Sequence, residues 1–96
     1  MDYQIEHRPN ENRWVLVDTT QQVMGEVMYA ITDDAHWRIR YVEVHPVLQG
    51  LGWAKKLVDA IYAHTQGKSI KLSSSCSYAT VMLSRKRHGN RTRADD

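Results

Sequence analysis

The chain has 96 residues, 42% hydrophobic and 25% charged, a balance typical of one globular domain and not of a disordered or fibrous chain. No apolar run approaches the ~18 residues of a membrane span, and the polar start lacks the layout of a signal peptide, so no membrane association is expected. The single cysteine, Cys76, excludes an internal disulfide and a cysteine-rich metal site, which favours a reducing, cytoplasmic setting.

The net charge of +2 is unevenly distributed along the sequence. Basic residues gather near the C-terminus, where almost nothing apolar could be buried: Arg85, Lys86, Arg87, Arg91 and Arg93. We therefore expect one domain over residues 1–87 and a basic, flexible tail over residues 88–96. Because the rest of the chain is nearly neutral, the composition does not favour a nucleic-acid-binding face.

The first half of the sequence reads as four β-strands separated by short turns. Alternating or continuous apolar residues predict strands over residues 3–7, 13–18, 23–31 and 36–44. Three short turns in succession imply an antiparallel meander. In the fourth strand, simple alternation predicts that Trp37, Ile39, Tyr41 and Glu43 share one face, and that Arg38, Arg40, Val42 and Val44 share the other.

The period of the hydrophobic pattern changes after Pro46, which cannot donate to a β-ladder. Apolar residues then recur at helical spacing: Trp53, Ala54, Leu57, Val58, Ile61 and Tyr62. A short strand over residues 69–72 and a final helix capped by Ser75 or Ser77 follow. A strand–helix–strand unit is a right-handed crossover, so the fifth strand should run parallel to the fourth. The predicted fold class is therefore α/β: a mixed sheet, an antiparallel meander plus one parallel strand, with helices on both faces.

Two glycines, Gly50 and Gly52, stand directly before the long helix. Glycine allows unusual backbone angles and a close approach to a ligand, and the first N–H groups of a helix lack partners within the helix. Together they suggest an anion site, although such a pair is also a common tight turn. A Walker A loop is absent, and the third glycine of a dinucleotide fingerprint falls on Lys55.

The stretch Gln49-x-x-Gly52-x-Ala54 resembles the [Arg/Gln]-x-x-Gly-x-[Gly/Ala] signature of the GNAT superfamily of acetyl-CoA-dependent N-acetyltransferases. The chain is most similar to the very small GNAT-like proteins, whose loop and whose later Cys-x-Tyr element match residues 44–58 and Cys76-Ser77-Tyr78. The order of predicted elements matches as well. One departure is Leu51, which stands where these proteins usually carry glutamine.

The resemblance implies that acetyl-CoA is the co-substrate and that backbone N–H groups of the loop hold its pyrophosphate. The implied coenzyme-binding residues are Val44, Gln49, Gly50, Leu51, Gly52, Trp53 and Ala54. It also implies direct attack of an amine on the thioester, with a backbone N–H near Val44 polarising the carbonyl oxygen. No metal is expected, because the histidines show no ligand spacing.

Three side chains are candidates for catalysis, each with a plainer interpretation. Glu43, near the end of the fourth strand, is a candidate general base, directly or through water, or a surface carboxylate; the neighbouring His45 is a second candidate base. Cys76 would lie near the coenzyme thiol, or pack as a small core residue. Tyr78 would protonate the leaving thiolate, as the resemblance implies, or serve packing.

The predicted function is therefore N-acetyl transfer from acetyl-CoA to an unidentified small-molecule or protein amine. Because only a turn separates the first two predicted strands, the acceptor side should be open or completed by another chain, as in a homodimer. Two alternatives stay open: an acyl-CoA-binding module without turnover, and an interaction domain for nucleic acid or protein that uses the basic tail.

Overall fold

A computed structural model describes residues 2–95, with the side chains of residues 2–86. Its elements, in chain order, are β1 (Gln4–Arg8), the 3₁₀ turn η1 (Pro9–Glu11), β2 (Arg13–Val17), β3 (Val23–Asp33), β4 (His36–Val44), the 3₁₀ turn η2 (Pro46–Leu48), α1 (Trp53–Gly67), β5 (Lys71–Ser74) and α2 (Ser77–Asp95).

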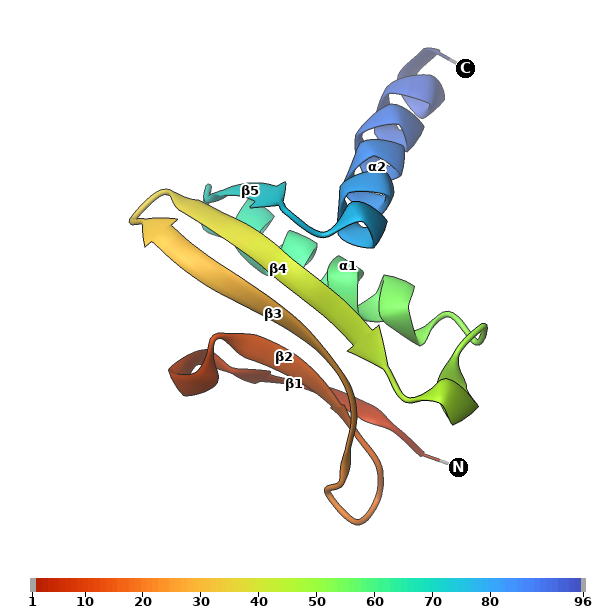
Figure 1. Ribbon diagram of the computed structural model, residues 1–96. Coiled ribbons are helices and arrows are strands. Elements are labelled where there is room, and N and C mark those ends of the chain that lie inside the picture. The colour runs from red at the N-terminus through yellow and green to blue at the C-terminus, as the bar shows by residue number, and fades with distance from the viewer. Residues whose placement is uncertain (1, 96) are drawn as a thin grey trace.

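The five strands form one sheet in the order β1-β2-β3-β4-β5 (Figure 1). The first four pair antiparallel, and β5 pairs parallel with β4. This confirms the predicted mixed sheet, in which a helical crossover returns the chain to a parallel neighbour. The β4–β5 pairing covers only His36–Ile39 of β4, so no strand in the described part of the chain pairs with the C-terminal half of β4 on that side.

A β-bulge in β4 overturns the predicted division of its two faces. Met28 of β3 lies opposite Tyr41, whereas the next residue, Tyr29, lies opposite Ile39, so Arg40 is the extra residue. An extra residue shifts the alternation by one position. Trp37 and Ile39 therefore share the core face with Val42 and Val44, not with Tyr41 and Glu43.

Both helices pack into one hydrophobic core on the same side of the sheet. The core cluster joins Leu57, Val58 and Ile61 of α1 with Ala79 and Leu83 of α2. In Figure 1, α1 lies behind the sheet, and no helix crosses in front of β1–β4. The predicted α/β fold, a mixed sheet with two helices, is confirmed; α2 packs beside α1, and Lys86 of α2 pairs with Asp59 of α1. Within residues 2–95, no helix covers the other face of β1–β4, which we call the uncovered face (Figure 1).

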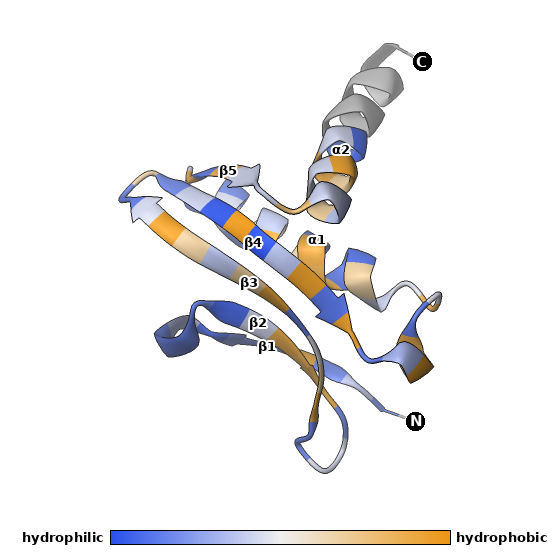
Figure 2. Cartoon of the chain, viewed as in Figure 1, coloured by the Kyte–Doolittle hydropathy of each residue, from blue (hydrophilic) through white to orange (hydrophobic). Residues whose placement is uncertain are grey.

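The helical stripe predicted for α1 is the face that this core buries. Leu57, Val58 and Ile61 are completely buried. Figure 2 shows hydrophobic and hydrophilic residues interspersed along α1. Burial of side chains of this size stabilises a fold by roughly 1.5–3 kcal/mol each. The burial holds the N-terminal end of α1 beside the end of β4.

A cluster of aromatic and histidine rings joins β1 to α1. Its members are His7, Trp14, Tyr29, Trp37 and His64. His7 stacks on Trp14 with ring centroids 3.6 Å apart and lies 4.9 Å from His64. Its Nε2 is 2.9 Å from the Tyr29 hydroxyl. Burial, and the proximity of the other imidazole, lower the pKa of His7; burial, and the charge of Lys68, lower the pKa of His64.

We expect the protein to lose stability as the pH falls below the ordinary histidine pKa of 6.5. Because both pKa values are lower in the folded state, the unfolded chain binds protons first as the pH falls. The free energy of unfolding is therefore highest above pH 6.5 and decreases as the pH falls from 6.5 to the lowered pKa values. The measurement is the urea midpoint at pH 8 and at pH 5.

His64→Gln should flatten this dependence, because it removes one titrating ring. His45→Gln, the same change at an exposed histidine outside the aromatic cluster, is the matched control. Asp18 and Asp59, whose pKa values are lowered from 3.8, titrate below this window. An equal slope in His64→Gln and the parent would contradict the assignment.

Lys86 anchors α2 to α1. Its ammonium pairs with Asp59 of α1 and lies 5.1 Å from the centre of the Tyr62 ring. The backbone of α2 continues to Asp95, whereas the side chains of the predicted tail, residues 88–96, lie outside the described residues. The domain boundary after residue 87 and the flexibility of the tail stay predictions.

Candidate functional site

A cavity of about 310 Å³ opens where β4, the glycine loop and α2 meet. It is lined by Val44, Leu48, Gln49, Gly50, Gly52, Trp53, Ala54 and Tyr78. Six of the predicted coenzyme-binding residues are thus gathered around one space, together with the candidate proton donor Tyr78. We call this space the loop cavity.

The loop reaches this position through two glycines and one glutamine. Gly50 and Gly52 adopt φ of 81° and 89°, in the left-handed region that L-residues with a side chain rarely adopt. The side-chain amide of Gln49 donates a hydrogen bond of 3.1 Å to the carbonyl of Val44. The signature glutamine therefore ties the loop to the end of β4.

The N-terminus of α1 faces the loop without a side chain to cap it. Gly52 is the N-cap residue, and the first turn carries no acidic residue. Lys55 and Lys56 lie in that turn; Lys56 extends over the Trp53 ring at 4.4 Å. The ammonium of Lys55 pairs with Asp59 at 3.2 Å. Free N–H groups, the helix dipole and the ammonium of Lys56 make this end of α1 suited to an anion such as a pyrophosphate.

The backbone of β4 presents an N–H group toward the loop cavity. The N–H of His45 donates to the carbonyl of Met24 in β3, at 2.8 Å. Because successive N–H groups of a strand point in opposite directions, the N–H of Val44 points away from β3, toward the diverged edge beside β5. The position predicted to polarise a carbonyl oxygen therefore borders the loop cavity.

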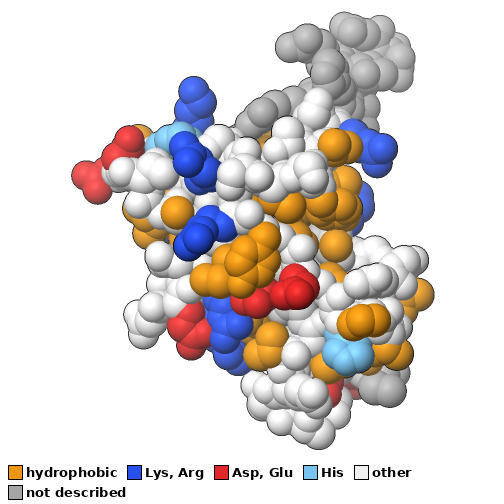
Figure 3. All heavy atoms as spheres, in the orientation of Figure 1, with side chains coloured by type: hydrophobic (Ala, Val, Ile, Leu, Met, Phe, Trp, Pro, Cys, Tyr) orange, Lys and Arg blue, Asp and Glu red, His pale blue; other side chains and the backbone are white. Residues whose placement is uncertain are grey.

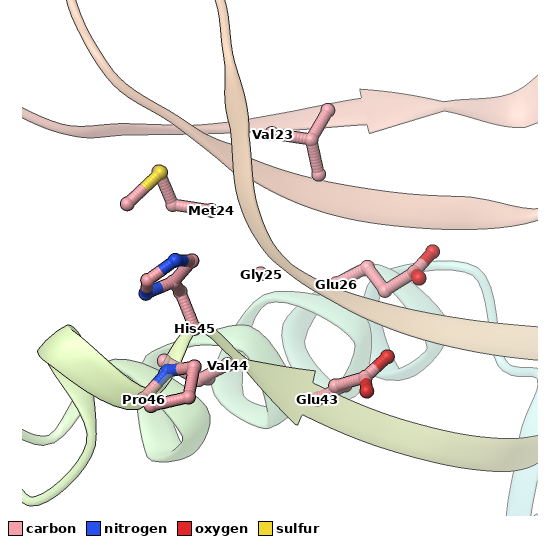
Figure 4. A pocket seen from close by; sticks show the side chains of 8 residues that line it. All are labelled: Val23, Met24, Gly25, Glu26, Glu43, Val44, His45 and Pro46. Atoms are coloured by element: carbon pink, nitrogen blue, oxygen red, sulfur yellow. The ribbon is translucent and has the colours of Figure 1, made fainter.

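A second cavity, of about 260 Å³, lies at the junction of β3 and β4. Its lining residues are Val23, Met24, Gly25, Glu26, Glu43, Val44, His45 and Pro46 (Figure 4). Val44 lines both cavities, so the two spaces meet at one residue of β4. We call this space the strand cavity; it contains both candidate bases, Glu43 and His45.

Figure 3 shows acidic and basic side chains close together on the face that it presents. Glu26 contacts two of the side chains around it. Arg13 donates a hydrogen bond of 2.9 Å to one oxygen of Glu26, and the Tyr41 hydroxyl donates to the other at 3.3 Å. Hydrogen bonding to Glu26 raises the pKa of Arg13. Burial, followed by the negative charge of Glu26 and that of Glu43, raises the pKa of the Tyr41 hydroxyl.

Two predicted site residues line neither cavity. Leu51 is 64% exposed on the outside of the loop. Cys76 is half-buried against the core, and its carbonyl accepts hydrogen bonds from the N–H and the hydroxyl of Thr80, at 2.9 Å each, at the start of α2. The backbone N–H of Cys76 donates to the Ser74 hydroxyl at 3.0 Å.

Glu26, Arg13 and Tyr41 were not among the site residues predicted from the sequence. A signal was present in the hairpin between β3 and β4. Its turn pairs Asp33 with His36, and counting outward from that pair places Glu43 opposite Glu26, because a second irregularity, between Ile31 and Asp33 of β3, offsets the bulge at Arg40. This is the register that the structure has.

Among the residues that the structure describes, no group of three histidine, cysteine, aspartate or glutamate side chains could hold a metal ion. In the same residues, no helix is long and apolar enough to cross a membrane.

Solved acetyltransferases share this fold. A GCN5-like N-acetyltransferase from Staphylococcus aureus aligns at 28% identity and a TM-score of 0.65, over 86% of this chain and 79% of that one. N-acetylglutamate synthase from Neisseria gonorrhoeae, solved with coenzyme A and N-acetyl-glutamate, aligns at 21% identity and a TM-score of 0.57, over 72% of this chain and 19% of that one. Ribosomal-protein-alanine N-acetyltransferase from Brucella melitensis aligns at 19% identity and a TM-score of 0.55, over 70% and 52%.

No curated protein matches this sequence. The family model described as GCN5-related N-acetyl-transferase matches residues 13–91, which include β2 through most of α2 and both cavities. Together with the bulged β4, the glycine loop and the parallel β5, this match shows that the chain belongs to the GCN5-related N-acetyltransferase family.

Proposed function

We propose that the protein transfers an acetyl group from acetyl-CoA to an amine by direct attack. The observation that carries the proposal is the meeting of the two cavities at Val44: one suits an anionic, thioester-bearing ligand, and the other presents carboxylates. A thioester carbonyl beside the N–H of Val44 would be accessible to the coenzyme from the loop cavity and to the acceptor amine from the strand cavity.

The residues of the loop cavity fit coenzyme A. The N–H groups of the loop and of the first turn of α1 would hold the pyrophosphate, with Lys55 and Lys56 nearby. The uncapped start of α1 and the two left-handed glycines leave backbone donors free of competing side chains. The pantetheine arm would run along the unpaired edge of β4, toward Val44 and Tyr78.

Each residue then has one task in the transfer. Glu43 removes a proton from the ammonium of the acceptor, directly or through water, so that the nitrogen can attack. The N–H of Val44 donates a hydrogen bond to the carbonyl oxygen as negative charge develops on it. Tyr78 donates a proton to the departing sulfur. Cys76 forms no acyl intermediate, since the amine attacks the thioester itself.

Acetyl-CoA is expected to stabilise the folded protein. A ligand at 100 times its dissociation constant adds about 2.7 kcal/mol to the free energy of unfolding. For a domain of this size that is a rise of roughly 10 °C or more in Tm. The measurement is thermal unfolding with and without millimolar acetyl-CoA, and the absence of any shift would refute the proposal.

Product analysis then separates an enzyme from a binding module. Mass spectrometry of amine mixtures incubated with acetyl-CoA should reveal an acetylated amine formed only with the protein. Binding without any such product would favour the acyl-CoA-binding alternative. We place this activity in the cytoplasm, on the strength of the single unpaired Cys76, and propose a homodimer as the form that would complete the open acceptor side.

A further inference from the structure

The strand cavity presents two carboxylates directly opposite each other. Glu26 of β3 and Glu43 of β4 are partners in the antiparallel register. Figure 4 shows their side chains projecting to the same side. Side chains at such positions lie about 4.5–5.5 Å apart at Cβ, and like charges there destabilise a sheet. The sequence therefore retains an unfavourable pair at the mouth of a cavity.

The two carboxylates differ in their surroundings. Glu26 is held by Arg13 at 2.9 Å and by the Tyr41 hydroxyl at 3.3 Å. Glu43 makes no ion pair or side-chain hydrogen bond within the part of the chain that the structure describes. Arg13 offsets one negative charge at most, and it also contacts Glu11. One uncompensated negative charge thus faces the cavity.

The rest of the lining is apolar. Val23, Met24 and Pro46 surround the space beside the carboxylates. A cavity with an uncompensated carboxylate and an apolar wall matches a positively charged group on an alkyl chain.

We propose that Glu26 and Glu43 together bind the acceptor as a primary alkylammonium, and that Glu26 is a specificity-determining residue of the proposed reaction. The acetylation of the bound amine rests on the proposed function, whereas its binding to the two carboxylates does not. Glu26, positioned by Arg13 and Tyr41, holds the nitrogen, and the carboxylate of Glu43 takes the proton.

The reaction balances with these groups. The ammonium gives one proton to Glu43, and its lone pair forms a bond to the thioester carbon. The carbon–sulfur bond breaks, and sulfur takes a proton from Tyr78. One of the two protons still on nitrogen then restores Tyr78, and the other stays on the amide. Release of the proton from Glu43 to solvent completes one turnover, giving an amide, free coenzyme A and one proton.

Binding to the full chain loaded with coenzyme A tests the inference without turnover. Backbone amide NMR of the ¹⁵N-labelled protein is followed while 1,5-diaminopentane is added. We expect shifts at Gly25, Glu26 and Glu43 in the parent protein. Two analogues should bind at least about tenfold more weakly. The first, 1,5-pentanediol, has no positive charge; in the second, 5-aminopentanoate, a carboxylate cancels the charge of the ammonium.

A matched pair of variants assigns the effect to the cavity. Glu26→Gln should weaken binding of 1,5-diaminopentane about tenfold or more. Glu11→Gln is the control, because Glu11 also pairs with Arg13, at 2.6 Å, but does not line the cavity. Equal weakening in both variants would show an effect of Arg13 alone and overturn the proposal.

If Glu26→Gln does not fold, titrations of the parent protein alone still test the alkylammonium site. Shifts that appear with 1,5-pentanediol as strongly as with the diamine, or that lie away from β3 and β4, would overturn the alkylammonium assignment. A short lysine peptide with neutral flanks distinguishes the sources: tighter binding than the free diamine indicates a protein lysine, and weaker binding a small amine. If coenzyme A does not bind, the proposed function fails, while the diamine titration still tests the cavity.

Discussion

Replacement of Glu43 by glutamine should lower kcat for acetyl transfer by about 100- to 10,000-fold, the usual contribution of a general base. Glutamine keeps the size of the side chain but cannot accept a proton from the ammonium. Since Glu43 lines the strand cavity and not the loop cavity, the stabilisation by acetyl-CoA should be unchanged. The readouts are the initial rate of product formation and the ligand-induced rise in Tm.

Glu11→Gln, which removes a carboxylate outside both cavities, should retain the parent rate. A Glu43→Gln variant with an unchanged rate would transfer the role of base to His45, and His45→Gln would then lose activity instead. A stable acetyl group on Cys76 in either variant, found by mass spectrometry with acetyl-CoA alone, would contradict direct attack.

The strand order and the helical crossover could be predicted because each follows from a local pattern. Because short turns can join only neighbouring antiparallel strands, the topology of the first four strands must be a meander. The helical spacing of Leu57, Val58 and Ile61 then requires a crossover, and a crossover requires a parallel strand. The glycine loop was placed correctly beside β4 for the same reason, since the chain leaves no other path to α1.

The faces of β4 could not be predicted because a single residue reverses them. Arg40 is unremarkable in the sequence, and the bulge exists because Met28 and Tyr29 pair with residues that are not consecutive. Without the bulge, Val42 and Val44 would face solvent, and Glu43 would enter the core. The cost of burying a carboxylate makes the bulged register the stable one.

The paired carboxylates were missed for a different reason. Glu26 lies 17 positions before Glu43, and only the register of the hairpin brings the two together. Periodicity identifies the face on which a residue lies, but not its partner across the strands. The sequence also does not distinguish Cys76 from Tyr78, which are two positions apart. Of these two residues, Tyr78 lines the loop cavity and Cys76 does not.

Replacement of Gly52 by aspartate should abolish binding of acetyl-CoA. A Cβ added at Gly52 meets no atom within 4 Å, so the side chain has room, and it would lie where the pyrophosphate is proposed to bind. Two unit charges ~5 Å apart repel by about 3 kcal/mol at an effective dielectric of ~20, which corresponds to more than a hundredfold in affinity. The measurement is the dissociation constant for acetyl-CoA by calorimetry.

Gly52→Ala is the matched control, because any side chain at φ 89° is strained and that strain costs about 1–2 kcal/mol of stability with or without a charge. Alanine should therefore lower Tm by a similar amount yet retain measurable binding. Part of the affinity lost in Gly52→Asp should return at high ionic strength, since salt screens repulsion between partly exposed charges. Equal loss of affinity in both variants, insensitive to salt, would show that the left-handed backbone of the loop, and not an anion site at the start of α1, controls binding of the coenzyme.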